Sequence, residues 1–478
     1  MLKNSLVKYL GIICICFLYT ACSVKNLVKK TESKEVPASF VSTKDTSNAA
    51  TLKWKEFFTD PNLVALIDTA LVKNQDLNIF LQEINIARNE VRARKGMYLP
   101  SVNGVGNAGV ARTPQYTSQG ASDAVNDITP GQKVPVVLPN FSIGLSATWE
   151  LDIWKKLRNS KKAAMYRYLA TQQGKNFLVT NLIAEIANSY YELMALDNQL
   201  AILKSNIEIQ QNALEIVKME KQSAKVTELA VRRFEAEVLK NQSRQYYIEQ
   251  SIVESENRIN YLMGRFPQPI VRSSETFLNV MPDTLHIGIP AQLLENRPDV
   301  MEAEQRLVAS KLDVKSAKAN FYPTLMVNAG LGYQAFSLQY LISSPESLVF
   351  GIAGQLVAPL INRNAIKATY YTANNRQVQA AYYYEQTILN AYIEVANQQS
   401  NISNLEKSYK LQTQQVQALT RSIDISTGLF KSARADYMEV LLVQRDALQA
   451  KFELIDTKKM QLNARINIYQ ALGGGWRQ

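Results

Sequence analysis

Few side chains in this 478-residue sequence have the type or spacing that catalysis requires. His286 is the single histidine, and a lone histidine is more often structural than catalytic. The sequence has no Gly-x-Ser-x-Gly elbow, no phosphate-binding loop and no Cys/His set with metal-ligand spacing. Its eleven methionines are scattered, so they indicate no copper or silver site. We therefore expect no enzymatic activity, no metal site and no cofactor.

The cysteines instead point to export and acylation. Residues 1–21 have the layout of an export signal: a basic start, a short apolar run and small residues before Cys22. The ending Leu18-Tyr19-Thr20-Ala21-Cys22 resembles a bacterial lipoprotein box, with Tyr19 where that box usually has Leu. Cleavage there removes the other two cysteines, so stability must come from packing rather than from a disulfide. Cys22 is the predicted lipidation site, a carrier of palmitate; the alternative is a stray cysteine within a signal peptide.

The formal charge of +11 raises the question of a nucleic-acid partner. Lys and Arg alternate with Asp and Glu in stretches such as residues 215–221, a pattern typical of a solvated helix face. No basic block with interleaved aromatic residues favours nucleic-acid binding. Beyond the N-terminus, no run approaches the roughly 20 apolar residues of a spanning helix. Any part of this chain that spans a membrane must therefore do so with strands.

The proline distribution predicts two long helices. No proline lies between Pro139 and Pro267 and none follows Pro359, while both tracts are rich in helix-forming residues. Apolar residues in these tracts recur at alternating steps of three and four, which is coiled-coil spacing. A helix over residues 155–222 would be about 100 Å long at about 1.5 Å per residue. The first set of steps is Leu193, Leu196, Leu200, Leu203, Ile207, Gln210, Leu214 and Val217; the second is Ile402, Leu405, Tyr409, Gln412, Val416, Leu419, Ile423 and Ser426.

The sequence also repeats itself. The two sets of steps are 209 residues apart, and Met263-Gly264 matches Leu472-Gly473 at the same offset. Nearer the N-terminus the offset is 223, and between these blocks it falls to 207. The chain is therefore a tandem duplication. The fall in offset places an insertion at Pro114–Pro139 of the first copy, rich in Ser, Gly, Asp and Pro, which we expect to be a loop.

Two segments have the alternation of strands. In residues 141–151 and 325–333, apolar residues alternate with small or polar ones. Lipid on one side and water on the other require this pattern of a membrane strand, although a buried sandwich strand has it too. Trp149 and Tyr333 are candidate interfacial anchors, with ordinary packing as the alternative. Each copy thus reads helix (63–96 and 292–319), strand pair, long helix, turn and shorter helix (226–262 and 435–472). We expect the two shorter helices of each copy to stack end on beside the long one.

These patterns give a fold class that is mainly α with a membrane β part. Four strands cannot close a barrel, and lipid does not tolerate open sheet edges, so the chain must form an oligomer. Eight-stranded barrels are filled by their own side chains, so a conducting pore favours three copies over two. The expected organisation is a signal peptide (1–21), a lipidated segment (22–62), a first repeat (63–264, with a β-hairpin at 99–153 and a helical hairpin at 155–262), a linker (265–291), a second repeat (292–473, with a β-hairpin at 323–359 and a helical hairpin at 361–472) and a tail (474–478).

From Trp54 to Trp476 the sequence resembles the TolC-like outer-membrane efflux proteins, specifically their lipoprotein branch. The motifs that carry the resemblance are Phe58-Thr59-Asp60-Pro61-Asn62-Leu63, Tyr98-Leu99-Pro100-Ser101, Trp149-Glu150-Leu151-Asp152, Glu295-Asn296-Arg297-Pro298-Asp299-Val300 and Asp436-Tyr437-Met438-Glu439-Val440-Leu441. The resemblance implies a homotrimer with a twelve-stranded β-barrel in the outer membrane, continued by a twelve-helix α-barrel tunnel into the periplasm. It implies an exit duct for small molecules, with a periplasmic adaptor protein and an inner-membrane pump as partners. A type I protein-secretion duct and a pore-less structural coiled-coil lipoprotein are the alternatives.

A duct needs a constriction, and the turns that join the long and short helices are the candidates. Asp436 and Glu439 would form rings of like charge if they faced the lumen of a trimer, and such rings select and gate cations. In the alternative, these acids only complement the dipole at a helix start. Lys431 and Arg434 are the nearest candidate partners that would hold such a gate closed.

Overall fold

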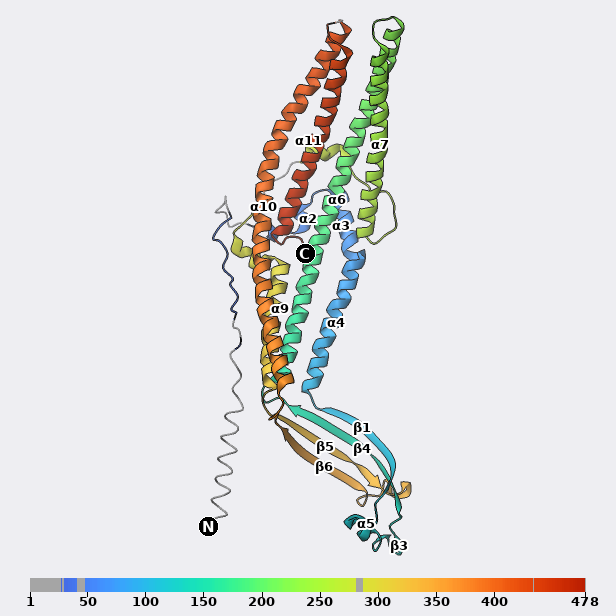
Figure 1. The fold of residues 1–478 in the computed structure, drawn as a ribbon, viewed down its shortest axis with the longest axis vertical. Helices are drawn as coiled ribbons and strands as arrows, with labels where there is room; N and C mark the ends of the chain where they lie inside the picture. Colours follow the sequence, from blue (N-terminus) through green and yellow to red (C-terminus); the bar gives the residue numbers. More distant parts are fainter. Residues whose placement is uncertain (1–26, 28–29, 41–47, 281–286, 433, 478) are drawn as a thin grey trace. The chain divides into compact units, whose positions relative to one another are not determined.

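The computed structural model describes residues 27, 30–40, 48–280, 287–432 and 434–477, of which most are helical (Figure 1). Cys22, His286 and the turn residue Ala433 lie outside these ranges. The chain divides into two compact units. Unit 1 comprises Met1–Thr31, Asn85–Leu169 and Gln305–Ala381, and unit 2 comprises Glu32–Ile84, Ala170–Glu304 and Tyr382–Gln478. Each unit therefore contains segments from both copies of the repeat.

Unit 1 contains a four-stranded sheet with the strand order β1-β4-β5-β6. Its strands are β1 (Ser101–Arg112), β4 (Val137–Leu151), β5 (Thr324–Ala335) and β6 (Leu348–Val357). All neighbouring strands are antiparallel, so each copy contributes one hairpin and the two hairpins join through β4 and β5. Both predicted strand segments are confirmed. Among the described residues, β1 and β6 have no strand on their outer edges.

The insertion in the first copy is more ordered than the loop we expected. It contains a short helix, α5 (Ser118–Asp123), and a small hairpin of β2 (Asp127–Thr129) and β3 (Gln132–Lys133). The Thr117 side chain caps α5 by accepting a hydrogen bond from the Gly120 amide, and Gly131 turns the hairpin at a φ of +80°. Polar residues that are typical of loops also supply caps and turns, so composition alone missed these elements.

The long helices occur where the sequence predicts them. They are α6 (Lys156–Gln222) and α10 (Asn364–Lys431), and each begins just after a strand of the sheet. At these corners Lys155 and Asn362 adopt left-handed φ angles of 59° and 52°. The two corner residues are 207 positions apart, which is the repeat offset of this part of the sequence. The same backbone device therefore turns each copy from strand to helix.

Two predicted helices are in fact broken. The predicted helix 63–96 consists of α3 (Pro61–Lys73) and α4 (Gln75–Tyr98), with Asn74 between them. Asn74 interrupts the helix because its side chain accepts a hydrogen bond from the Leu77 amide and so caps α4 (2.8 Å). The predicted helix 292–319 likewise consists of α8 (Leu293–Asn296) and α9 (Pro298–Ala319), because the residue before a proline disfavours helical backbone.

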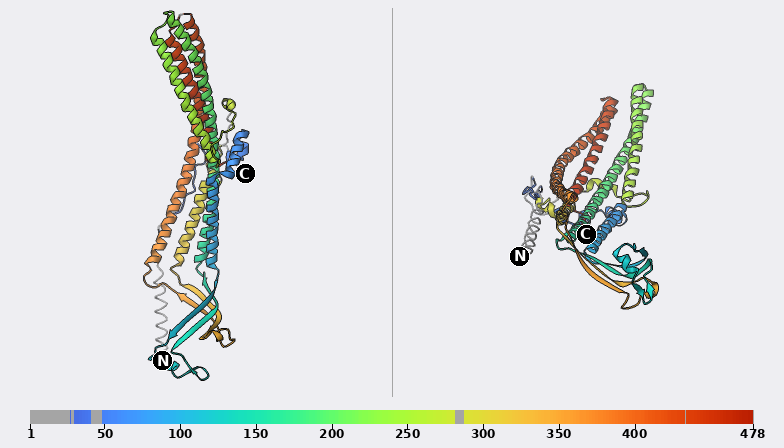
Figure 2. Two further views of the ribbon diagram at one scale, coloured as in Figure 1. Left: turned by 90° about the vertical axis from the view of Figure 1, so that its right-hand side faces the viewer. Right: turned by 60° about the horizontal axis from the view of Figure 1, so that its bottom comes forward.

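In unit 2, α6 and α10 each fold back onto a shorter helix, α7 (Glu228–Leu262) and α11 (Tyr437–Ala471), as Figure 2 shows. The first predicted set of steps, from Leu193 to Val217, forms a seam along α6 that is mostly buried, and Leu203 in it is fully buried against α7 and α11. The second seam is only half-buried along most of its length. The remaining short elements are η1 (Ala49–Thr51), α2 (Trp54–Phe57), η2 (Ser274–Asn279), η3 (Pro290–Gln292) and, in unit 1, η4 (Leu338–Tyr340). Within the described ranges, no helix is long and apolar enough to cross a membrane.

Candidate functional site

The sheet of unit 1 has one apolar face and one polar face. Strand pairing places residues of like character opposite one another, as with Leu145 and Leu331 on one face and Thr148 and Asn328 on the other. The apolar face remains exposed, and Ile352 on β6 is 80% accessible. An exposed apolar surface of this extent indicates contact with lipid or another protein. The apolar face comprises Val102, Val110, Ile143, Leu145, Trp149, Val327, Leu331, Tyr333, Leu348, Phe350, Ile352 and Leu356.

The polar face carries hydroxyl and amide groups that bond across strands. Ser101 and Thr148 share a hydrogen bond of 2.8 Å between β1 and β4. The Gln334 amide of β5 donates to Asn140 of β4 at 2.9 Å. Small and polar side chains leave this face compatible with water. The sheet thus has mainly apolar side chains on one face and mainly small or polar side chains on the other.

The motif that ends β4 fixes the start of α6. Asp152 is buried, and its carboxylate accepts hydrogen bonds from the amides of Leu157 (2.9 Å) and Arg158 (2.8 Å). A carboxylate at this place satisfies free amides and complements the helix dipole. The Trp149 indole donates to the Tyr98 carbonyl at 3.1 Å, which ties the end of α4 to β4. Trp149 and Asp152 therefore position the end of α4 and the start of α6 next to β4.

The structure brings the four predicted gate residues to the turn between α10 and α11 in unit 2. Lys431, Arg434, Asp436 and Glu439 are all exposed. Asp436 is the N-cap of α11 and accepts a hydrogen bond from the Met438 amide, as the alternative interpretation of this acid expects. Within the described part of the chain, no ion pair joins either base to either acid. Among the described residues, these four tip charges therefore do not neutralise one another by direct contact.

A buried ionic cluster at the start of α9 was not predicted as a site. The guanidinium of Arg297, which is 6% exposed, donates to both carboxylate oxygens of Asp299, at 3.0 and 2.8 Å. It also donates to the Glu394 carboxylate and the Ala471 carbonyl, each at 2.7 Å. Burial opposes the charge, but the carboxylates outweigh it and keep the pKa of Arg297 raised. The Arg-Pro-Asp sequence was a signal for this cluster, whereas Glu394 and Ala471 could not be foreseen.

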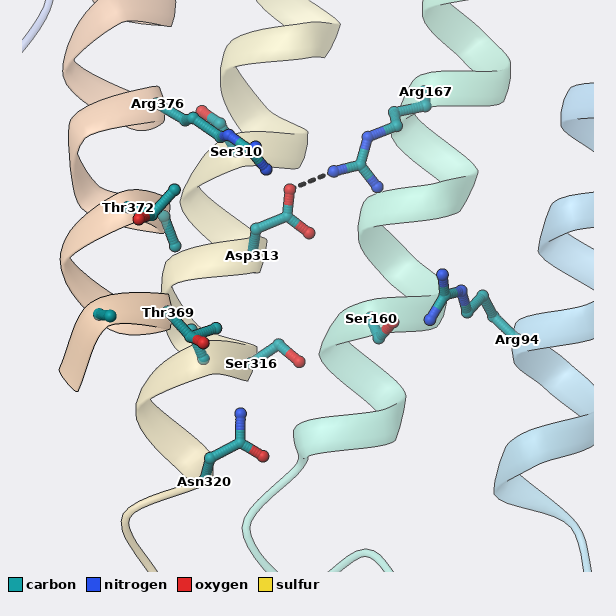
Figure 3. Close-up of a pocket in the computed structure, with 13 residues that line it drawn as sticks. Arg94, Ser160, Arg167, Ser310, Asp313, Ser316, Asn320, Thr369, Thr372 and Arg376 are labelled. Atoms are coloured by element: carbon teal, nitrogen blue, oxygen red, sulfur yellow. Dashed lines mark hydrogen bonds and ion pairs between the residues drawn. The ribbon is translucent and has the colours of Figure 1, made fainter. Parts of the chain in front are cut away.

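A second unpredicted feature is a polar pocket in unit 1, with a volume of about 540 Å³. It is lined by side chains from α4, α6, α9 and α10, among them Arg94, Arg167, Asp313 and Arg376 (Figure 3). Arg167 forms an ion pair with Asp313. The available signal was the density of Lys and Arg in the helices next to the strands. In the described ranges, no cluster of His, Cys, Asp or Glu has the arrangement of a metal site.

Known proteins share both the sequence pattern and the fold. The family model "Outer membrane efflux protein" matches residues 66–265 and 289–474. The cation efflux system protein CusC of Escherichia coli O6:H1 is 26% identical over 473 residues, covering 97% of this chain and 98% of that protein. The solvent efflux pump outer membrane protein SrpC of Pseudomonas putida is 25% identical over 425 residues, covering 89% of this chain and 87% of SrpC.

Among solved structures, the open state of the Neisseria gonorrhoeae MtrE outer membrane channel aligns with a TM-score of 0.80. That alignment has 21% sequence identity and covers 95% of this chain and 99% of MtrE, which shows the shared fold. The family match is the stronger finding because it spans both repeats. The chain belongs to the outer membrane efflux protein family.

Proposed function

We propose that this protein is the outer-membrane exit duct of a tripartite efflux system. It would pass small molecules, delivered by an inner-membrane pump through a periplasmic adaptor protein, across the outer membrane. The observation that carries the proposal is the two-faced sheet with open edges, in a chain that matches the efflux family over both repeats. A pore-less coiled-coil lipoprotein would have no use for such a sheet.

The open edges support a trimer. The outer edges of β1 and β6 carry backbone amides and carbonyls that lipid cannot satisfy, so β6 of one copy would pair with β1 of the next. Three copies would close a twelve-stranded barrel, with the apolar face toward lipid and the polar face around water. The long and short helices would continue this barrel as a twelve-helix tunnel into the periplasm. The half-buried second seam supports the same assembly, because a neighbouring chain would complete its burial.

Two further parts of the proposal concern anchoring and cargo. Acylation at Cys22 would tether the N-terminus to the outer membrane in addition to the barrel.

The relatives are named for different cargoes, a cation system for CusC and a solvent pump for SrpC. Family membership therefore leaves the cargo open, and the pump would choose it.

The tip of unit 2 would be the gate. In a trimer, three copies of Asp436 and Glu439 would surround one axis, where their like charges would repel and favour cations. Because no ion pair among the described residues neutralises these acids, Lys431 and Arg434 would be available to the acids of a neighbouring chain. Such contacts would hold the closed state.

Planar-bilayer recording and native mass spectrometry test the proposal together. The protein purified in mild detergent should have the mass of three chains, and its reconstitution should produce ion conductance. A stable monomer would contradict the barrel and the tunnel. Trimers without conductance, even after the tip is loosened by Arg434→Ala, would instead favour a structural role.

A further inference from the structure

The positive charge of this protein is concentrated in the helical parts of unit 1. Residues 85–98, 156–169, 305–319 and 364–381 together contain fifteen Lys and Arg but only two carboxylates, Glu90 and Asp313. This surplus of thirteen exceeds the +11 of the whole chain, so the rest of the protein is nearly balanced. The interleaved charges of residues 215–221 are thus not representative of this region. A surplus so concentrated produces a local field that attracts anions.

Part of this charge converges on the pocket between α4, α6, α9 and α10. Arg94 and Arg376 reach toward the same space from opposite sides, and Arg167 approaches Asp313 between them (Figure 3). The other lining residues are hydroxyl-bearing, amide or alanine side chains, and none is a large apolar residue. Three guanidinium groups against one carboxylate leave the lining with a net charge of +2. The pocket therefore suits a solute with an anionic group and hydrogen-bond acceptors.

The carboxylates near the pocket do not neutralise all of its positive charge. Asp313 is engaged by Arg167, and Arg94 is shared with Glu90 at 2.6 Å. Among the described residues, no hydrogen bond or ion pair engages the guanidinium of Arg376, although its charge acts on Asp313. Burial raises the pKa of Asp313, and the surrounding guanidiniums oppose that rise. The side chains of Arg167 and Asp313 are half-exposed, so a solute can reach them.

The N-terminal segment indicates which way the pocket faces. Leu27 packs in a cluster with Phe321 and Tyr370, and Gln377 donates a hydrogen bond to the Lys30 carbonyl at 3.3 Å. Successive helix residues lie about 100° apart, so Arg376 of α10 points away from the side of Tyr370 and Gln377. A segment that follows a lipid anchor approaches a tunnel from outside. The pocket, on a different side of α10, would then face the lumen.

We propose that this pocket binds phosphate or carboxylate groups of solutes in the duct, so that the channel favours anionic solutes at this point. The inference rests on the proposed function for its lumen-facing position. Three copies around the axis would carry nine guanidiniums against three carboxylates. Solutes would thus meet an anion-attracting zone in unit 1, in addition to the acids proposed at the tip.

Isothermal titration of the full-length trimer in detergent with inorganic phosphate tests binding without requiring an open channel. We expect saturable binding that Arg376→Gln weakens about tenfold, or about 1.4 kcal/mol, because the substitution removes a charged hydrogen-bond donor. Lys367→Gln removes the same charge from another side of α10 and should leave phosphate affinity unchanged. Asp313→Asn removes the one negative charge of the pocket and should tighten binding.

Bilayer recordings provide the second readout. Arg376→Gln should lower the permeability ratio of chloride to potassium, and Lys367→Gln should not. If the wild-type channel conducts but neither phosphate binding nor ion preference responds to Arg376→Gln, the inference fails while the proposed function stands. If nothing conducts, the proposed function fails and the titration still reports on the pocket. Binding that appears only with phosphatidylglycerol in nanodiscs, and not with phosphate alone, would identify a lipid headgroup site and overturn the proposal.

Discussion

At the scale of single residues, Arg297 is a buried charged residue with several hydrogen-bond partners. Its buried guanidinium donates hydrogen bonds to both carboxylate oxygens of Asp299. It donates another to the carbonyl of Ala471, the last residue of α11. Lysine would keep the charge but could not reproduce the planar fork of donors. Asp299 has a side chain that is only 20% accessible, so losing its partner is costly because little water can replace the lost bonds.

We expect Arg297→Lys to destabilise the protein by about 2 kcal/mol and Arg297→Ala by about 3–5 kcal/mol. The midpoint of thermal unfolding, followed by circular dichroism in detergent, measures the effect. Arg445→Lys is the matched control, since Arg445 pairs with Asp446 at the surface and such pairs contribute about 0–1 kcal/mol. Equal effects of the two lysine substitutions would show that the buried cluster has no special role.

The tip residues need substitutions that separate charge from helix capping. Asp436→Asn removes the charge and keeps a good N-cap, whereas alanine would also cost about 1 kcal/mol of helix stability. If the acids line the lumen, Asp436→Asn and Glu439→Ala should each lower the cation-to-anion permeability ratio about twofold or more. Arg434→Ala should raise the basal conductance. Glu453→Gln, an exposed acid far along α11, is the control. An unchanged ratio in both acid variants would place these carboxylates outside the lumen.

The joints between helices follow one plan in both repeats. The Asn74 amide donates to the Leu262 carbonyl at the end of α7, and the Arg297 guanidinium donates to Ala471 at the end of α11. Leu262 and Ala471 are 209 positions apart, and Asn74 and Arg297 are 223 apart, in agreement with the repeat offsets. These bonds confirm that the shorter helices meet end on. The break in each predicted helix is therefore the place where it receives the end of its partner.

Glycine is required where these ends meet. Gly473 has a φ of +88°, and a Cβ atom there would lie 2.4 Å from the Asn296 carbonyl oxygen. Gly473→Ala should therefore cost at least about 2 kcal/mol, since backbone strain adds to the clash. Gly428 lies inside α10 with open space around its Cβ position, so Gly428→Ala should be neutral or stabilise by up to about 1 kcal/mol. Thermal unfolding of the two variants should shift in opposite directions, or only Gly473→Ala should shift.

For the whole molecule, family membership and the two-faced sheet argue for a channel, and the N-terminal sequence argues for a lipid anchor. The anchor and the proposed barrel would hold the protein in the membrane independently. The contribution of the lipid anchor can therefore be tested while the sheet is left intact.

We expect Cys22→Ser to abolish acylation, because the serine hydroxyl cannot take the place of the thiol that receives the lipid. Metabolic labelling with palmitate measures this directly. The variant should remain partly inserted, since the sheet retains its apolar face. Unchanged labelling would disprove lipidation at Cys22, and complete release from the membrane would contradict the proposed barrel.

The sequence by itself determined the elements that depend on local order. Proline spacing and the steps of three and four predicted α6 and α10 to within a few residues, because helix formation and periodic burial are read along the chain. Alternation predicted β4 and β5, and the repeat offsets predicted the common plan of both copies. The family-like motifs at Asp152 and Arg297 became intelligible as caps and joints only once their partners were known.

The tertiary structure decided what depends on residues far apart in sequence. The breaks at Asn74 and Arg297 have local causes, but the helix ends that they contact, Leu262 of α7 and Ala471 of α11, lie far away in the sequence. The first seam is mostly buried because it packs against both α7 and α11, whereas the second remains mostly half-buried among the described residues. The polar pocket in unit 1 is lined by four helices that come from both repeats, so no single stretch of the sequence contains all of its residues. Local sequence patterns determine whether a segment forms a helix or a strand. Which residues are buried, which helix ends meet and which charges lie close together depend on how the whole chain packs.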